Sequence, residues 1–255
     1  MKVSTGDIKY VQSLQQKKFR RQHGVFVAEG EKIVKELLSS DFEIEGIYGV
    51  AEWIEQNKSS LQKGISLFTV SENELGRISG LKTPNQVLAV VKTPTLLSEP
   101  DLSRSGVILA LDTLQDPGNL GTIIRTADWF GIRQIVCSHE TADVFSPKVI
   151  QATMGSFLRV SVLYTDLAEW LETIRIEVPI YGAFPEGDNM FDIQPGIGGI
   201  LVIGNESAGI SARVSKCVSR RVKIPGGLPP EKGSSPDSLN ASIAAGILMS
   251  VLTRT

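Results

Sequence analysis

Two uninterrupted apolar runs constrain the fold of this chain more than any other feature. Val107–Leu111 (VILAL) and Gly199–Ile203 (GILVI) contain no polar side chain, which is typical of parallel strands that helices cover on both faces. Helical periodicity follows the first run from Leu120 to Phe130. The C-terminal part of the chain is therefore predicted to form a doubly wound, mostly parallel α/β sheet.

The same alternation of strands and helices covers the rest of the chain. In the C-terminal part we expect further strands at Gln134–Cys137, Leu158–Leu163, Ile180–Phe184 and Val222–Ile224, and helices from Pro147 to near Ser156, at Leu167–Ile176 and at Leu239–Thr253. Upstream, a smaller α/β unit is predicted from strands at Val25–Ala28, Ile44–Val50, Ser66–Val70 and Gln86–Val91 and a helix at Glu29–Ser39.

The segment Lys92–Gly106 (KTPTLLSEPDLSRSG) separates these two parts. It holds two prolines and several serine and threonine residues with little periodicity, which indicates a linker. We therefore place domains at residues 1–95 and 106–255, joined by a linker at 96–105. The length of 255 residues allows a hydrophobic core in each domain.

Composition excludes several classes of protein. Hydrophobic residues make up 42% and charged residues 21%, as in an average soluble protein. Cys137 and Cys217 follow no zinc or redox spacing, and with only two histidines no metal site is expected. The N-terminus lacks the apolar core of a signal peptide, and no apolar run approaches the roughly 20 residues of a membrane helix. We expect a cytoplasmic protein without membrane attachment.

The formal net charge is −2, so no global positive field indicates a nucleic-acid partner. Basic residues nevertheless gather in two stretches. These are Lys9, Lys17, Lys18, Arg20 and Arg21 in the first, and Arg213, Lys216, Arg220, Arg221 and Lys223 in the second. Each stretch is either a solvated face or a phosphate-binding surface.

Several familiar catalytic signatures are missing from the sequence. No Gly-x-Gly-x-x-Gly follows a strand, no phosphate loop with Gly-Lys-Ser/Thr occurs, and no histidine lies in a glycine-rich turn. These absences disfavour a dehydrogenase, a nucleotide hydrolase and an esterase with a serine–histidine triad.

Two glycine-rich turns follow the apolar runs. In Asp112–Arg125 (DTLQDPGNLGTIIR), Asn119 is a natural N-cap for the next helix and Arg125 projects from its second turn. In Ile203–Gly209 (IGNESAG), Gly204 allows close backbone approach and Glu206 stands at the carboxyl end of a strand, where open α/β sheets bind ligands. A capped turn with a surface arginine, and a helix start with a favourable acidic residue, are the structural alternatives.

A third turn precedes the last helix. The strand ending at Ile224-Pro225 leads through a loop to Ser238-Leu239-Asn240, which opens a helix rich in alanine and glycine. Ser238 and Asn240 are suited either to cap that helix or to bind a ligand. The small residues favour close approach of another helix.

The three turns together, in this order, strongly resemble the SpoU (TrmH-type) family of RNA ribose 2′-O-methyltransferases. The resemblance rests on Asn-x-Gly-x-x-x-Arg, Gly-Asn-Glu-x-x-Gly and Ile-Pro…Ser-Leu-Asn-x-Ser, and covers Val107 to the C-terminus. The stretch Arg20–Glu31 (RRQHGVFVAEGE) is similar to the substrate-binding domain of many members, which has a ribosomal-protein-like α/β fold.

The resemblance implies a catalytic domain of the SPOUT type with a deep trefoil knot, and a homodimer whose site is completed across two subunits. It implies methyl transfer from S-adenosylmethionine to a ribose 2′-hydroxyl without a metal. The catalytic candidates are Arg125, Asn119, Glu206 and Asn240. The cofactor-binding candidates are Ile203, Gly204, Ile224, Pro225, Ser238 and Leu239. The RNA-binding candidates are Lys17, Lys18, Arg20 and Arg21.

One segment departs from the family pattern. Residues 226–237 (GGLPPEKGSSPD) form a longer connection than usual, with Gly226 in place of a common methionine. The expected substrate is ribosomal RNA of the 23S type. The alternatives are a transfer RNA 2′-O-methyltransferase and a non-catalytic RNA-binding protein that keeps the fold. A nucleotide-dependent oxidoreductase is remote, because the dinucleotide fingerprint is absent.

Overall fold

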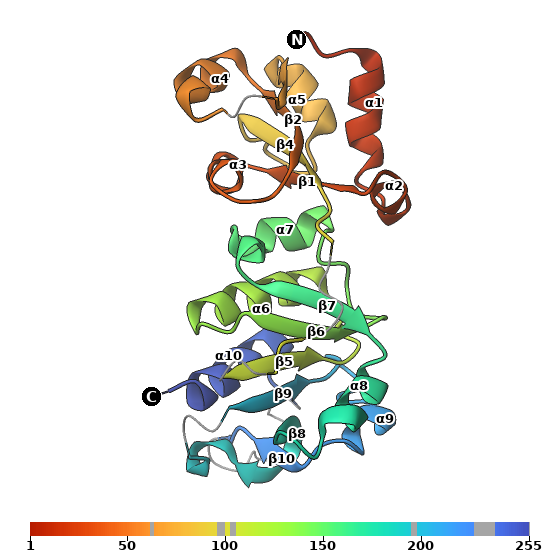
Figure 1. The fold of residues 1–255 in the computed structure, drawn as a ribbon, viewed down its shortest axis with the longest axis vertical. Helices are drawn as coiled ribbons and strands as arrows, with labels where there is room; N and C mark the ends of the chain where they lie inside the picture. Colours follow the sequence, from red (N-terminus) through yellow and green to blue (C-terminus); the bar gives the residue numbers. More distant parts are fainter. Residues whose placement is uncertain (62–63, 96–99, 103–105, 195–197, 227–237, 255) are drawn as a thin grey trace, which may run out of the picture. The chain divides into compact units, whose positions relative to one another are not determined.

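The computed structural model describes residues 1–61, 64–95, 100–102, 106–194, 198–226 and 238–254 (Figure 1). The chain divides into two compact units. Unit 1 comprises Met1–Thr95 with Asp143–Leu158, and unit 2 comprises Leu96–Ala142 with Arg159–Thr255. Within the described residues, no helix is both long enough and apolar enough to cross a bilayer.

Unit 1 is built on a mixed sheet in the order β1-β4-β2-β3. Strand β4 is antiparallel to β1 and β2, and β3 is parallel to β2. Its elements up to residue 95 are α1 (Thr5–Ser13), α2 (Lys17–His23), β1 (Val25–Glu29), α3 (Glu31–Leu38), β2 (Ile44–Gly49), α4 (Ala51–Asn57), η1 (Lys58–Ser60), β3 (Ser66–Thr69), α5 (Glu72–Ile78) and β4 (Val87–Lys92). Helices α1 and α5 each begin with a reciprocal capping box, Ser4 with Asp7 and Ser71 with Glu74.

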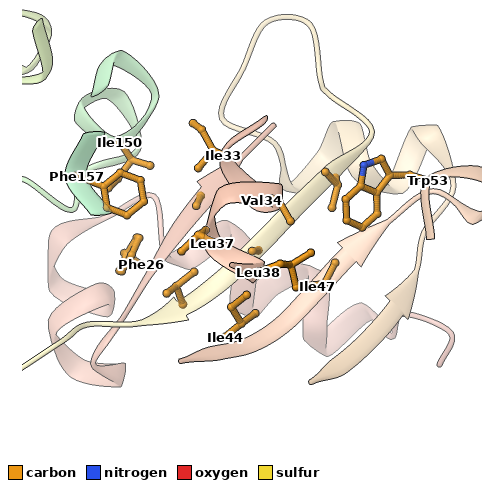
Figure 2. Packing of buried hydrophobic residues seen from close by; sticks show 14 residues of the cluster. Phe26, Ile33, Val34, Leu37, Leu38, Ile44, Ile47, Trp53, Ile150 and Phe157 are labelled. Carbon is orange, nitrogen blue, oxygen red and sulfur yellow. The ribbon is translucent and has the colours of Figure 1, made fainter. Parts of the chain in front are cut away.

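A segment from the second half of the chain completes the core of unit 1. Residues 143–158 include α7 (Pro147–Thr153) and η2 (Ser156–Leu158). Figure 2 shows Ile150 and Phe157 beside Phe26 in one hydrophobic cluster, and the rings of Phe26 and Phe157 meet edge to face at 5.8 Å. By sequence this segment falls between strands of the C-terminal domain. The structure groups it with the N-terminal unit, because its apolar side chains pack there.

Unit 2 confirms the expected parallel sheet. Its strands lie in the order β10-β8-β9-β5-β6-β7, and every neighbouring pair is parallel. The elements are β5 (Val107–Leu111), α6 (Pro117–Trp129), β6 (Gln134–Ser138), β7 (Ser161–Thr165), α8 (Leu167–Ile174), β8 (Ile180–Asn189), η3 (Met190–Asp192), β9 (Gly199–Ile203), α9 (Ala212–Ser215), β10 (Arg220–Lys223) and α10 (Ala241–Leu252). Both apolar runs form central strands with the predicted bounds.

Helices cover this sheet as the two buried runs require. Helices α8 and α9 pack on the face formed by alternate residues such as Ile108, Ala110 and Val202. Helix α10 lies beside α6 and also contacts β9. The trefoil knot stays a prediction, since residues 227–237 of the segment that would thread it lie outside the described residues.

Candidate active site

The candidate site lies where the strand order of the parallel sheet changes direction. Strand β5 has β6 on one side and β9 on the other, and all three are parallel. The loops that leave β5 and β9 therefore start at the same edge and diverge. Ligands of open α/β sheets bind in the crevice outside such a switch point.

Three of the predicted polar side chains meet at this edge. The Nδ2 of Asn119 donates to Oε1 of Glu206 at 2.9 Å, and the Nδ2 of Asn240 donates to Oδ1 of Asn119 at 3.0 Å. An ionised carboxylate only accepts hydrogen bonds, so the Asn119 amide is assigned with its nitrogen toward Glu206 and its oxygen toward Asn240. Asn119, Glu206 and Asn240 are called the polar cluster below.

Asn119 occupies a different helical position from the predicted one. Helix α6 begins at Pro117, and its N-cap is Asp116, whose carboxylate accepts the Asn119 N–H at 2.8 Å. The prediction of Asn119 as N-cap is wrong, because an aspartate followed by proline at the first helical position provides a stronger start. The Asn119 side chain is thereby available to the polar cluster, and Arg125 lies in the third turn.

Asn240 both caps a helix and belongs to the polar cluster. Its Oδ1 accepts the N–H groups of Ser242 at 2.9 Å and Ile243 at 3.3 Å at the start of α10. The other end of the same amide reaches Asn119. The cap therefore holds the Asn240 side chain in one orientation and places the positive end of α10 beside the cluster.

Asn205 joins the loop after β9 to the loop after β5 through hydrogen bonds. This residue is not among those that the sequence predicts for the site. Its Oδ1 accepts the N–H groups of Ser207 and Ala208 at 2.9 and 3.0 Å, and its Nδ2 donates to the Thr113 carbonyl at 2.8 Å. An asparagine between glycine and glutamate is a signal for such a turn. These bonds place Glu206 opposite Asn119.

Gly204 is required by the tight return of this loop. A Cβ built on it would lie 2.2 Å from the carbonyl carbon of Gly209 and 2.3 Å from the nitrogen of Ile210. Only glycine fits this close approach of two backbone segments. The predicted reason for Gly204 holds, and the approaching group is the loop's own backbone.

A second missed residue is Asp112, which follows β5 directly. It is buried, and its carboxylate accepts the Ser211 N–H at 2.7 Å and the Thr113 hydroxyl at 3.2 Å. It thus ties the end of β5 to the start of α9. Its position after an apolar strand was the available signal, since a carboxylate there must find donors when buried.

Most cofactor-binding candidates lie just before a member of the polar cluster in the sequence, and the others follow β10. Ile203 and Gly204 are buried at the end of β9, Ile224 is half-buried after β10, and Leu239, which precedes Asn240, exposes 48% of its surface. Backbone groups with aliphatic side chains suit a ligand that has apolar faces and polar edges. Pro225 and Ser238 are exposed, and residues 227–237 of the unusual connection lie outside the described residues.

Arg125 is not part of the polar cluster. It is exposed on α6, about 120° around the helix from Asn119 at roughly 100° per residue. Within the described part of the chain, no hydrogen bond joins it to Asn119, Glu206 or Asn240. It shares its exposed face with Trp129, four residues on, which is 85% exposed.

The RNA-binding candidates lie on α2 and are not equivalent. Lys17, Lys18 and Arg21 are exposed, whereas Arg20 is 5% exposed and forms an ion pair of 2.6 Å with Asp143. A buried arginine that is already paired is not available to a phosphate. The structure therefore corrects the prediction for Arg20 and leaves the other three as candidates.

Family models match almost the whole chain. Residues 106–250 match the SpoU rRNA Methylase family, and residues 6–89 match an MRM3-like substrate binding domain. Among curated proteins, the chain is 32% identical over 244 residues to the 23S rRNA (guanosine(2553)-2′-O)-methyltransferase RlmP of Bacillus subtilis (strain 168). That alignment covers 95% of this chain and 94% of the relative.

Solved structures agree over the same length. A protein from Porphyromonas gingivalis, assigned to the TrmH family of RNA methyltransferases, superposes with a TM-score of 0.85 and 36% identity, covering 98% of each chain. An AdoMet-bound rRNA methyltransferase from Sinorhizobium meliloti superposes with a TM-score of 0.85 and 28% identity, covering 98% of this chain and 96% of that one. The chain therefore belongs to the SpoU family of rRNA methylases.

Proposed function

We propose that this protein transfers the methyl group of S-adenosylmethionine to a ribose 2′-hydroxyl of ribosomal RNA. The observation that carries the proposal is the polar cluster, which unites residues from the first turn of α6, the loop after β9 and the N-cap of α10 at the switch point of the sheet. The Bacillus subtilis relative is named for this reaction on 23S rRNA. The Sinorhizobium meliloti structure holds AdoMet, and S-adenosylmethionine would supply a methyl group on an electrophilic sulfonium.

The chain's own residues must align and activate a weak nucleophile. A ribose hydroxyl is protonated at neutral pH, so its orientation toward the methyl group is the main task, and alignment contributes about 7–11 kcal/mol in favourable cases. The Glu206 carboxylate, held by Asn119, provides an acceptor for a hydroxyl proton. The hydrogen bond from Asn240 to Asn119 holds the Asn119 amide in the orientation in which it donates to Glu206.

Arg125 is assigned to the RNA phosphate. A guanidinium keeps its proton above pH 12, which makes it a poor base, whereas its planar fork matches two phosphate oxygens. Arg125 lies on the exposed face of α6. We propose that it completes the site of a second subunit across that face.

The proposed second subunit is another copy of this chain, bound to α6 and α10. Helix α10 carries no charged side chain from Ala241 to Leu252, and a helix that is apolar all round is normally buried. Yet Ile243 is 55% exposed, and Trp129 on neighbouring α6 is 85% exposed. Exposed apolar side chains on paired helices support an interface there.

Replacing Ile243 with lysine is therefore expected to separate the proposed dimer. A lysine buried in an apolar interface without a partner costs several kcal/mol, so the dimer Kd should rise by about 100-fold or more. Sedimentation equilibrium of both proteins measures the change. Ile176→Lys is the matched control, because Ile176 is 91% exposed near α8 on the other side of the sheet. An equal dimer Kd for the Ile243→Lys and Ile176→Lys variants would contradict this interface.

A cytoplasmic location is also proposed. Both cysteines, Cys137 and Cys217, are buried free thiols, as proteins of reducing compartments usually have. Burial raises the pKa of the Cys137 thiol, so it stays protonated and is no nucleophile at neutral pH.

A tritium-transfer assay tests the proposed substrate class. Purified protein and labelled S-adenosylmethionine are offered unmodified 23S rRNA and transfer RNA in separate reactions. Label in the ribosomal RNA alone is expected. Label in transfer RNA alone would favour the alternative substrate. Heat of S-adenosylmethionine binding in calorimetry separates an enzyme from a non-catalytic RNA-binding protein, which would show neither binding nor transfer.

A further inference from the structure

The buried Arg20 joins three parts of unit 1 at one guanidinium. It donates to the carbonyl oxygens of Leu14 and Gln15, each at 2.9 Å, and to Oδ2 of Asp143 at 2.6 Å. Carbonyls at the end of a helix have no partner within that helix, so Arg20 satisfies the end of α1. The carboxylate of Asp143 compensates the charge that burial would otherwise penalise.

This arrangement decides which side of α2 meets solvent. With Arg20 turned inward, Lys17, Lys18 and Arg21 are the exposed cations of the helix. The N-cap residue, Gln16, forms no side-chain capping bond. The Arg20 contacts are therefore a principal restraint on the orientation of α2 and its cations.

Asp143 is held on its own side by further bonds. Its Oδ1 accepts the Phe145 N–H at 3.1 Å, and its carbonyl accepts the Ser146 N–H at 3.0 Å. The segment that begins here continues into α7, whose Ile150 lies in the core beside Phe26 (Figure 2). The ion pair thus joins α2 to a segment that is itself anchored in unit 1.

The residue before Asp143 belongs to unit 2 and is fixed there. The Ala142 N–H donates to the Leu114 carbonyl at 2.9 Å, and its carbonyl accepts the hydroxyl of Tyr164. Leu114 lies in the loop between β5 and α6, two residues before the N-cap Asp116. A single peptide bond joins Ala142 to Asp143, the partner of Arg20.

We propose that Arg20 and Asp143 are positioning residues for the RNA substrate, an inference that rests on the proposed function. Their ion pair fixes the orientation of α2, and with it the exposed cations of that helix, within unit 1. Neither side chain contacts the RNA. Loss of the pair weakens productive RNA binding, while S-adenosylmethionine binding and the methyl-transfer step remain.

The substitution Asp143→Asn separates this role from general electrostatics. Removing the carboxylate that pairs with α2 makes unit 1 more positive, which by itself strengthens RNA binding. Loss of positioning weakens it. The two explanations therefore predict opposite signs for one variant, and the asparagine keeps the size of the side chain.

The test compares steady-state methylation of an unmodified 23S rRNA transcript by the wild type and Asp143→Asn. The KM for RNA should rise about tenfold, a typical size for coupling within a contact network, while kcat stays within about twofold. The S-adenosylmethionine Kd from calorimetry should not change. Asp41→Asn, with the same charge change at an exposed position of unit 1, should leave the KM unchanged or slightly lower.

A double-mutant cycle links the effect to the ion pair. Arg20→Lys keeps the charge but loses the fork that reaches two carbonyls and a carboxylate at once. Each single variant should raise the KM for RNA by some factor. The Arg20→Lys/Asp143→Asn double variant should raise it by a factor well below the product of those two factors. Multiplicative effects, an unchanged or lower KM for Asp143→Asn, or an equal loss of S-adenosylmethionine affinity would each overturn the proposal.

RNA affinity measured by fluorescence anisotropy, without turnover, keeps the two proposals distinguishable. Wild-type protein that binds the transcript but transfers no methyl group would refute the proposed function. In that case, weaker binding by Asp143→Asn than by Asp41→Asn would still support positioning, and equal binding would overturn it.

Discussion

Arg125→Ala is expected to reduce methyl transfer by about 10²–10³-fold or more, the usual cost of removing one preorganised charged or donor group from a transition state. S-adenosylmethionine binding should stay intact. The reason is the position of Arg125, which is exposed on α6 and lies outside the polar cluster. Single-turnover methylation of 23S rRNA and calorimetry with S-adenosylmethionine measure the two effects separately.

Two further variants test whether Arg125 acts by binding a phosphate. Arg125→Lys keeps the positive charge but not the planar fork, so a phosphate clamp should lose most of its effect with lysine as well. Arg175→Ala removes an exposed arginine whose partner is Glu172 on α8, and activity should not change. Because Arg125 lies on the proposed dimer face, sedimentation of each variant is required. Loss of S-adenosylmethionine binding in a dimeric Arg125→Ala protein would contradict the assigned role.

Gly204→Ala is expected to lower S-adenosylmethionine affinity by about 100-fold or more. The new methyl group would lie 2.2–2.5 Å from backbone atoms of Gly209 and Ile210, and backbone cannot yield as a flexible side chain can. The loop must move, and with it Glu206. Overpacking of this kind typically costs 1–3 kcal/mol of stability, so the Tm should fall too. Calorimetry and thermal unfolding report the two quantities.

The control for Gly204→Ala is Gly76→Ala. Gly76 lies within α5 of unit 1, and its added Cβ would meet only Pro84 at an ordinary 3.8 Å. Alanine favours a helix over glycine by about 1 kcal/mol, so this variant should be as stable as the wild type or more so. A Gly204→Ala protein that binds S-adenosylmethionine normally would show that the loop after β9 is not part of the cofactor site.

The sequence predicts the central strands well and the edge strand β7 less well. Gly199–Ile203 and Val107–Leu111 have the expected bounds, since continuous apolar runs between polar residues leave little choice. The predicted strand Leu158–Leu163 instead begins at Ser161, because Leu158 ends a 3₁₀ turn and packs against the core of unit 1. Periodicity does not distinguish a short apolar turn from a strand.

The sequence pattern also does not predict that α7 packs in unit 1. The helical pattern after Pro147 was visible, but a pattern gives the apolar face of a helix and not its partner. Ile150 and Phe157 pack with Phe26, more than a hundred residues earlier in the chain. Only tertiary contacts decide between two available cores.

The polar cluster was predictable in its members and not in its bonds. Asn119, Glu206 and Asn240 were chosen by family resemblance, while Asp116-Pro117 carried the true helix-start signal. The bond from Asn240 to Asn119 spans 121 positions, and no local rule provides it. The burial of Arg20 is not predictable for a related reason. A charge cluster in sequence does not reveal which cation is buried.

Nucleoside analysis of the reaction product tests the central claim most directly. Unmodified 23S rRNA is incubated with the protein and S-adenosylmethionine, digested to nucleosides and analysed by mass spectrometry, with Arg125→Ala as the blank. We predict one additional 2′-O-methylnucleoside that is absent from the blank. A methyl group on a base, or no new methylnucleoside from protein that binds both S-adenosylmethionine and the RNA, would contradict ribose methylation as the function of this chain.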